Sequence, residues 1–115
     1  MKTRISLFVF AALLSACSAA FAAEPQGSIV ILEPADGAVV PTHTPVTVKW
    51  QAVWGPDGNH LHLYMDYRMM DIERAADGSD TIRILFAGKH KICLAIETAW
   101  HFPTGVRKCI EVTAK

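Results

Sequence analysis

The 115-residue sequence lacks the short motifs that most often mark an enzyme. It contains no Gly-x-Ser-x-Gly nucleophile turn, no glycine-rich phosphate loop, no His-Glu-x-x-His motif and no Cys-x-x-Cys pair. Each of these motifs sets a nucleophile, a phosphate cradle or a metal ligand at a spacing that its chemistry requires. Their joint absence argues against those reaction classes, and we expect a non-enzymatic protein.

The sequence also lacks an excess of charge of one sign. Eleven Lys and Arg residues balance eleven Asp and Glu residues. Two of the basic residues, Lys2 and Arg4, belong to a predicted signal peptide, and without them nine basic residues remain against eleven acidic ones. No basic run or stripe is left, so we expect neither nucleic-acid binding nor electrostatic docking on an anionic membrane.

No apolar run at the N-terminus is long enough to span a bilayer. Residues 5–14 form a run of about ten residues, whereas a transmembrane helix needs roughly 20. The run follows Lys2 and Arg4 and precedes Ala20-Phe21-Ala22, an A-x-A cleavage site. Residues 1–22 are therefore predicted to be a signal peptide, and residues 23–115 a single periplasmic or secreted domain.

A second interpretation of the N-terminus stays open. Leu14-Ser15-Ala16-Cys17 is similar to the lipobox of bacterial lipoproteins, in which the cysteine is lipidated and becomes the new N-terminus. In that case the protein is an envelope lipoprotein anchored through Cys17, and only then do we expect contact with a membrane.

Cysteine is scarce, with three residues in the chain. Cys17 is removed or lipidated under either interpretation, which leaves one pair. Cys93 and Cys109 lie in two segments of alternating apolar and polar residues, both out of phase with the apolar set. In a hairpin they become cross-strand neighbours, so we predict a Cys93–Cys109 disulfide, formed in an oxidising compartment.

Alternation with a period of two residues recurs along the rest of the chain, and no long helical pattern appears. Residues 67–77 are ambiguous between an edge strand and a helical turn, and residues 77–80 (DGSD) are predicted to form a turn. About seven short strands separated by turns are typical of an all-β, antiparallel β-sandwich. The clearest runs are 28–33, 46–52, 60–66, 81–86, 88–97 and 106–112.

Four segments resemble small bacterial immunoglobulin-like or fibronectin III-like secreted domains: IVILEPADGAVV, LHLYMD, GKHKICLAI and VRKCIEV. The resemblance covers nearly all of residues 28–112. It implies a two-sheet sandwich but no particular chemistry, because this fold serves many functions. The predicted disulfide departs from antibody domains, since it joins neighbouring strands of one sheet and not the two sheets.

The histidines form the one cluster that could carry chemistry. His60 and His62 project from the same face of one strand. Pairing of that strand with residues 88–97 sets His60 opposite Glu97 and His62 opposite Ala95, and the loop with His101 lies at the same end. The three histidines and Glu97 are therefore candidate ligands for zinc or copper. The alternative is that His60 and His62 are an ordinary solvated pair on the surface.

Aromatic residues gather at the same predicted end of the sandwich. Trp54, Trp100 and Phe102 lie in or beside its loops, where they could contact a partner or simply close the core. We therefore expect an exported, non-enzymatic binding or accessory module of the bacterial periplasm. The main alternative is a periplasmic copper- or zinc-binding protein that uses surface histidines.

Overall fold

The computed structural model describes residues 27–115 of the chain. The predicted signal peptide and Cys17 fall outside the described residues. Within this range the structure contains strands only, and no helix is long and apolar enough to cross a membrane. The strands are β1 (Ser28–Glu33), β2 (Val39–Val40), β3 (Pro45–Val53), β4 (His60–Met65), β5 (Arg68–Glu73), β6 (Asp77–Arg83), β7 (Gly88–Glu97) and β8 (Pro103–Ala114).

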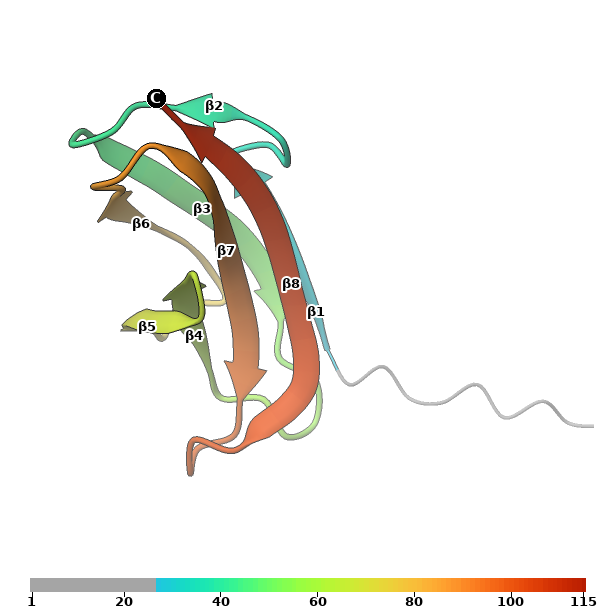
Figure 1. Ribbon diagram of the computed structural model, residues 1–115. Coiled ribbons are helices and arrows are strands. Elements are labelled where there is room, and N and C mark those ends of the chain that lie inside the picture. The colour runs from blue at the N-terminus through green and yellow to red at the C-terminus, as the bar shows by residue number, and fades with distance from the viewer. Residues whose placement is uncertain (1–26) are drawn as a thin grey trace, which may run out of the picture.

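The strands form two facing sheets (Figure 1). One sheet has the order β1-β3-β6 and the other the order β2-β8-β7-β4-β5. Every pairing is antiparallel except that of the two-residue strand β2 with β8. The predicted β-sandwich is confirmed, and β2 accounts for the eighth strand.

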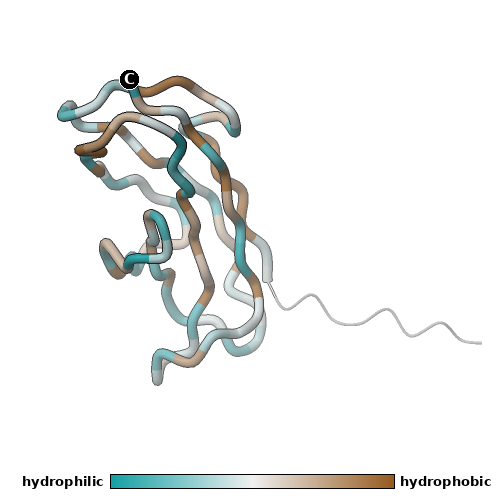
Figure 2. The backbone as a smooth tube through the Cα atoms, in the orientation of Figure 1, coloured by the Kyte–Doolittle hydropathy of each residue, from teal (hydrophilic) through white to brown (hydrophobic). Residues whose placement is uncertain are grey.

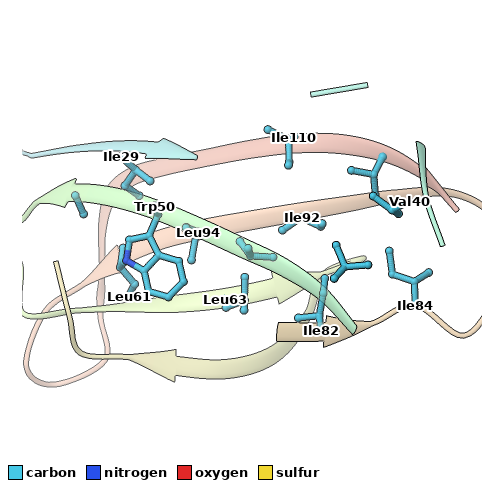
Figure 3. Close-up of a cluster of buried hydrophobic side chains, with 14 of the residues drawn as sticks. Ile29, Val40, Trp50, Leu61, Leu63, Ile82, Ile84, Ile92, Leu94 and Ile110 are labelled. Atoms are coloured by element: carbon cyan, nitrogen blue, oxygen red, sulfur yellow. The ribbon is translucent and has the colours of Figure 1, made fainter. Parts of the chain in front are cut away.

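The core lies between the two sheets and follows from the alternation in the sequence. Hydrophobic and hydrophilic segments alternate along the strands (Figure 2). In β3 the buried positions are Val46, Val48, Trp50 and Ala52, and the residues between them are exposed. Trp50 is 1% exposed and belongs to the buried cluster that also contains Leu61 of the opposite sheet (Figure 3). Burial of an aliphatic side chain such as Val48 contributes roughly 1.5–3 kcal/mol. A slip of one residue would expose all the buried side chains of β3, so the alternation fixes the register of the strand.

Two segments differ from the sequence predictions around β6. Residues 77–80 are the first half of β6 and not a turn. Gly78 pairs with Trp50, and a Cβ at Gly78 would lie 2.8 Å from Cζ2 of the Trp50 ring. Glycine is therefore needed here because β6 passes close to a large ring. In the sequence, the same glycine within DGSD has the appearance of a turn. The predicted strand 81–86 ends at Arg83, and Phe86, which lies beyond the end of β6, is 75% exposed.

The ambiguous segment after β4 is an edge strand. Met65 pairs with Arg68, so Asp66 and Tyr67 form a two-residue hairpin turn. Their φ angles are 49° and 67°, as a type I′ turn requires at both central positions. β5 then lies at the edge of the five-stranded sheet.

The predicted disulfide is confirmed. Cys93 of β7 pairs directly with Cys109 of β8, and their Cα atoms are 4.1 Å apart. The bond links the two strands that lead into and out of the turn at residues 98–102. That turn lies at the same end of the sandwich as the β3–β4 loop (Figure 1).

Candidate metal centre

Three histidines meet on the outer face of the five-stranded sheet. Leu61 and Leu63 of β4 point into the core, so His60 and His62 project from the opposite face of the same strand. His101 approaches them from the turn between β7 and β8. The predicted pairing is confirmed, because His60 lies opposite Glu97 and His62 opposite Ala95.

The turn that carries His101 is fixed by its own hydrogen bonds. The backbone N–H of Thr98 donates to the carbonyl of Phe102 over 2.8 Å, and that of His101 donates to the carbonyl of Thr98 over 3.0 Å. The Thr98 hydroxyl accepts a further bond from the N–H of Phe102. His101 has a φ of 62°, a left-handed conformation that residues other than glycine seldom adopt. Such backbone conformations concentrate at functional sites.

The ring nitrogens of the three histidines form a nearly equilateral triangle, which we call the histidine triangle. Nε2 of His60 is 3.0 Å from Nε2 of His62, and each of these atoms is 3.1 Å from Nδ1 of His101. A metal ion with bonds of about 2.05 Å to nitrogen would place its ligands about 2.9 Å apart at right angles and about 3.3 Å apart in a tetrahedron. The observed separations fall within this range.

Hydrogen bonds among the three rings cannot account for the triangle. Each of these nitrogens presents either one lone pair or one N–H in the plane of its ring. With three nitrogens in mutual contact, at least two are of the same kind, so at least one contact joins two lone pairs or two N–H groups. Such a contact is repulsive in the absence of a cation, whereas three lone pairs converging on one ion are favourable.

The outer nitrogens of the rings have partners that favour this arrangement. Nδ1 of His60 lies 2.9 Å from Oδ1 of Asn59, which can only accept, so this nitrogen donates. Nδ1 of His62 lies 3.3 Å from the Tyr64 hydroxyl and 3.5 Å from Oε1 of Glu97. When Nδ1 carries the proton, Nε2 of a neutral ring offers a lone pair. Carbonyl and carboxylate partners of this kind orient metal-binding histidines in proteins.

The histidines of β4 are not surface residues, which corrects that part of the prediction. His60 is 1% exposed and His62 is 7% exposed. The reason is that ring contacts with His101 cover this face of β4. Burial lowers the pKa of His60 below its ordinary value, and the neighbouring charges of His62, His101 and Arg74 lower it further. The neutral ring, which is the form that binds metals, is therefore favoured.

Glu97 lies behind His62 and outside the triangle. Its carboxylate is buried and approaches Nδ1 of His62, the nitrogen that faces away from His60 and His101. Its second oxygen, Oε2, is buried and has no hydrogen-bond partner among residues 27–115. The sequence prediction made Glu97 a direct ligand, whereas this position suits a residue that orients His62. Asn59 and Tyr64 were absent from the predicted site, although Tyr64 shares the outer face of β4 by simple alternation.

The three aromatic residues do not form one surface. Trp54 is partly buried and packs against the core, so it helps to close this end of the core. Trp100 is 81% exposed and Phe102 is 67% exposed, and they are the chain neighbours of His101. Only these two of the predicted partner-binding residues are therefore available to a partner.

A second group of polar residues lies on β5 and β6, each an edge strand of its sheet. Asp71, Glu73 and Asp80 bring their carboxylates within 4.8 Å of one another. Burial raises the pKa of Glu73 to about 8, with further contributions from the hydrogen bond and charge of Asp80 and from the charge of Asp71. The carboxyl group of Glu73 is therefore protonated at neutral pH, which relieves the crowding of like charges.

Solved structures share the architecture of this chain. A fibronectin III-like module of CbhA from Clostridium thermocellum superposes with a TM-score of 0.65 and 11% identity, covering 76% of this chain and 96% of the module. The chain has an immunoglobulin-like or fibronectin III-like β-sandwich fold. The CARDB domain of PF1109 from Pyrococcus furiosus superposes with a TM-score of 0.57 and 8% identity, covering 79% of this chain and 95% of the domain.

That CARDB domain has also been solved in complex with two metal ions, with a TM-score of 0.55 and 9% identity over 80% of this chain and 90% of the domain. No protein-family model and no curated protein sequence matches the chain. At these identities the similarity establishes the fold alone, so the function of the immunoglobulin-like domain has to be argued from its own residues.

Proposed function

We propose that this protein is an exported, non-enzymatic binding module whose ligand is a copper or zinc ion held by His60, His62 and His101. The observation that carries the proposal is the histidine triangle, with three ring nitrogens 3.0–3.1 Å apart. Without a metal ion, hydrogen bonds among the three rings leave at least one of these contacts repulsive. A cation at the centre of the triangle removes the repulsion. Imidazole nitrogen is a preferred ligand of both zinc and copper.

The buried carboxylate of Glu97 supports the same assignment. Burying a carboxylate with one oxygen unpartnered costs free energy, because the ion loses its hydration. A cation bound to His62 compensates this cost through the ring that separates the two. The carboxylate in turn favours the tautomer of His62 that binds the metal.

The geometry suits both ions. The observed separations correspond to nitrogen–metal–nitrogen angles of about 96°, if the bonds are about 2.05 Å long. Widening each contact by about 0.3 Å would reach the tetrahedral arrangement of zinc. Copper(II) accepts angles near 90° without this adjustment. Three protein ligands leave at least one position for an external ligand, as in sites that exchange their metal or bind a further molecule.

Export to the periplasm is part of the proposal. It is supported by the signal-like residues 1–22 and by the disulfide between Cys93 and Cys109, which persists in oxidising compartments. The mass of the mature protein tests it directly. Cleavage after Ala22 leaves an unmodified chain from Ala23, whereas lipidation leaves a chain that starts at a modified Cys17 and is held at a membrane.

Calorimetric titration with Cu²⁺ and Zn²⁺ tests metal binding. We expect one ion per chain for the purified protein, and loss of this binding in a His60→Ala/His62→Ala variant. His43→Asn is the matched control, because His43 is exposed, lies outside the triangle and has a φ of 59° that asparagine tolerates. Equal weak binding by all three proteins would overturn the proposal, provided that the circular dichroism spectra show all of them folded.

A further inference from the structure

A hollow of about 490 Å³ lies beside the histidine triangle on the outer face of the five-stranded sheet. His62 and His101 line it together with Tyr64, Met69 and Arg107, whereas the buried His60 does not. The triangle therefore borders the hollow along its His62–His101 edge. A ligand in the hollow would contact these two rings.

The shape of the triangle leaves one side of a bound ion free. Nitrogens 3.0–3.1 Å apart lie about 1.8 Å from their common centre, which is shorter than a metal–nitrogen bond of about 2.05 Å. The ion must therefore sit about 1 Å out of the plane of the three nitrogens. All three rings then approach it from one hemisphere, and an external ligand has to approach from the other.

Arg107 supplies a positive charge at the wall of the same hollow. Its guanidinium carbon lies 5.5 Å from the centre of the Tyr64 ring, and its Nε donates to Sγ of Cys109 over 3.4 Å. No carboxylate forms an ion pair with Arg107 within residues 27–115. The two Nη groups of the guanidinium are the part suited to paired hydrogen bonds with a planar oxyanion.

The balance of charge in the loaded site favours an anion. The ion contributes two positive charges and Arg107 one, and the neutral rings contribute none. Among residues 27–115, Glu97 is the one carboxylate that lines the hollow, and its single negative charge leaves an excess of positive charge. A small anion would reduce this excess, since opposite charges attract strongly where water is partly excluded.

We propose that the hollow binds a small carboxylate, with one oxygen on the free side of the metal ion and the carboxylate paired with the guanidinium of Arg107. This inference rests on the proposed metal site, because Arg107 alone is too exposed to hold a carboxylate tightly. Tyr64 positions Arg107 by contact with its guanidinium. The protein would then present a metal–carboxylate complex and not a bare ion.

The test uses the copper-loaded protein, acetate as the carboxylate and azide as a control anion. Azide ligates copper(II) but cannot form the paired hydrogen bonds that a carboxylate makes with a guanidinium. Titrations followed by visible absorption and by electron paramagnetic resonance report changes at the copper itself. We expect both anions to perturb the spectra. Arg107→Gln should weaken acetate binding roughly tenfold, because one charge-assisted interaction is lost, and leave azide binding within about twofold.

The control Arg107→Lys separates charge from the fork-shaped geometry. Lysine keeps the charge but not the paired donors, so we expect acetate affinity between those of the native protein and Arg107→Gln. Acetate that leaves the copper spectra unchanged, or that binds native and Arg107→Gln proteins equally, would refute the inference. In either case the spectrum of the copper-loaded native protein still demonstrates copper binding. Failure of the carboxylate proposal is therefore distinguishable from failure of the metal site. Failure to load copper at all would refute the proposed function first.

Discussion

Replacing Glu97 by glutamine should change the stability of the metal-free protein and its metal affinity in opposite directions. Glutamine keeps the shape of the side chain and an oxygen that can accept from Nδ1 of His62, which is 3.5 Å from Oε1 in the native chain. It removes a buried negative charge whose second oxygen has no hydrogen-bond partner in the described part of the chain. An uncharged amide costs less to bury than a carboxylate, so we expect the free energy of unfolding without metal to rise by about 1 kcal/mol.

With metal present, the same substitution removes the charge that orients and polarises His62. Loss of such a supporting carboxylate typically weakens metal binding 10–100-fold. At a free metal concentration 100 times the native Kd, binding stabilises the native protein by about 2.7 kcal/mol. A tenfold weaker site gains only about 1.4 kcal/mol at the same concentration. The stabilisation gained on metal binding should therefore fall by about half or more, although without metal the variant is more stable than the native protein.

Thermal unfolding with and without Zn²⁺ measures both effects. For a domain of this size about 1 kcal/mol corresponds to a Tm change of roughly 4–8 °C, which is easily resolved. Glu111→Gln is the control, because the Glu111 side chain is exposed and forms a surface pair with Lys89 at 3.6 Å. The reasoning would be refuted if Glu97→Gln were less stable than the native protein without metal and gained the same stabilisation from Zn²⁺. Glu97 would then have a purely structural role.

Two further predictions concern the scaffold. Replacing Cys93 and Cys109 by alanine should lower the free energy of unfolding by about 3 kcal/mol, as expected for a loop with a sequence separation of 16, and a loss below about 1 kcal/mol in urea titrations would contradict this. Glu73 has a pKa of about 8 in the fold against an ordinary value of 4.5. The unfolded chain therefore releases this proton first, so stability should fall as the pH rises from about 5 to 8, and Glu73→Gln should remove most of the fall. Identical pH profiles for the two proteins would contradict the assignment.

Most of the fold could be predicted from the alternation of apolar and polar side chains in the sequence. It predicted the burial of Trp50, the pairing of Cys93 with Cys109 and the position of His60 opposite Glu97. These features follow from the two-residue period of a strand, because a slip of one residue would reverse every side chain. Local sequence was misleading at Gly78, where the requirement for glycine comes from Trp50 on a neighbouring strand and not from a turn.

The sequence predicted which histidines meet, but not how deeply they are buried. Alternation places His60 and His62 on the face away from the core, and an outer face is normally solvated. Their burial depends on His101, which is 41 residues from His60 in the chain. The sequence likewise brought Glu97 near the site without showing its role. That role depends on the side of the His62 ring that the carboxylate approaches, which the pairing register does not determine.

The features that stabilise the sandwich also position the candidate site. β7 and β8 enclose the turn with His101, and the disulfide joins these strands through Cys93 and Cys109. β4 pairs with β7 and is anchored to the core by Leu61 and Leu63, which alternate with the two histidines. The three rings therefore belong to neighbouring strands of one sheet and to a hydrogen-bonded turn, so little conformational entropy remains to be lost when an ion binds. A metal site organised in this way is a property of the folded domain and should be lost on unfolding, because no short segment of the chain contains all three ligands.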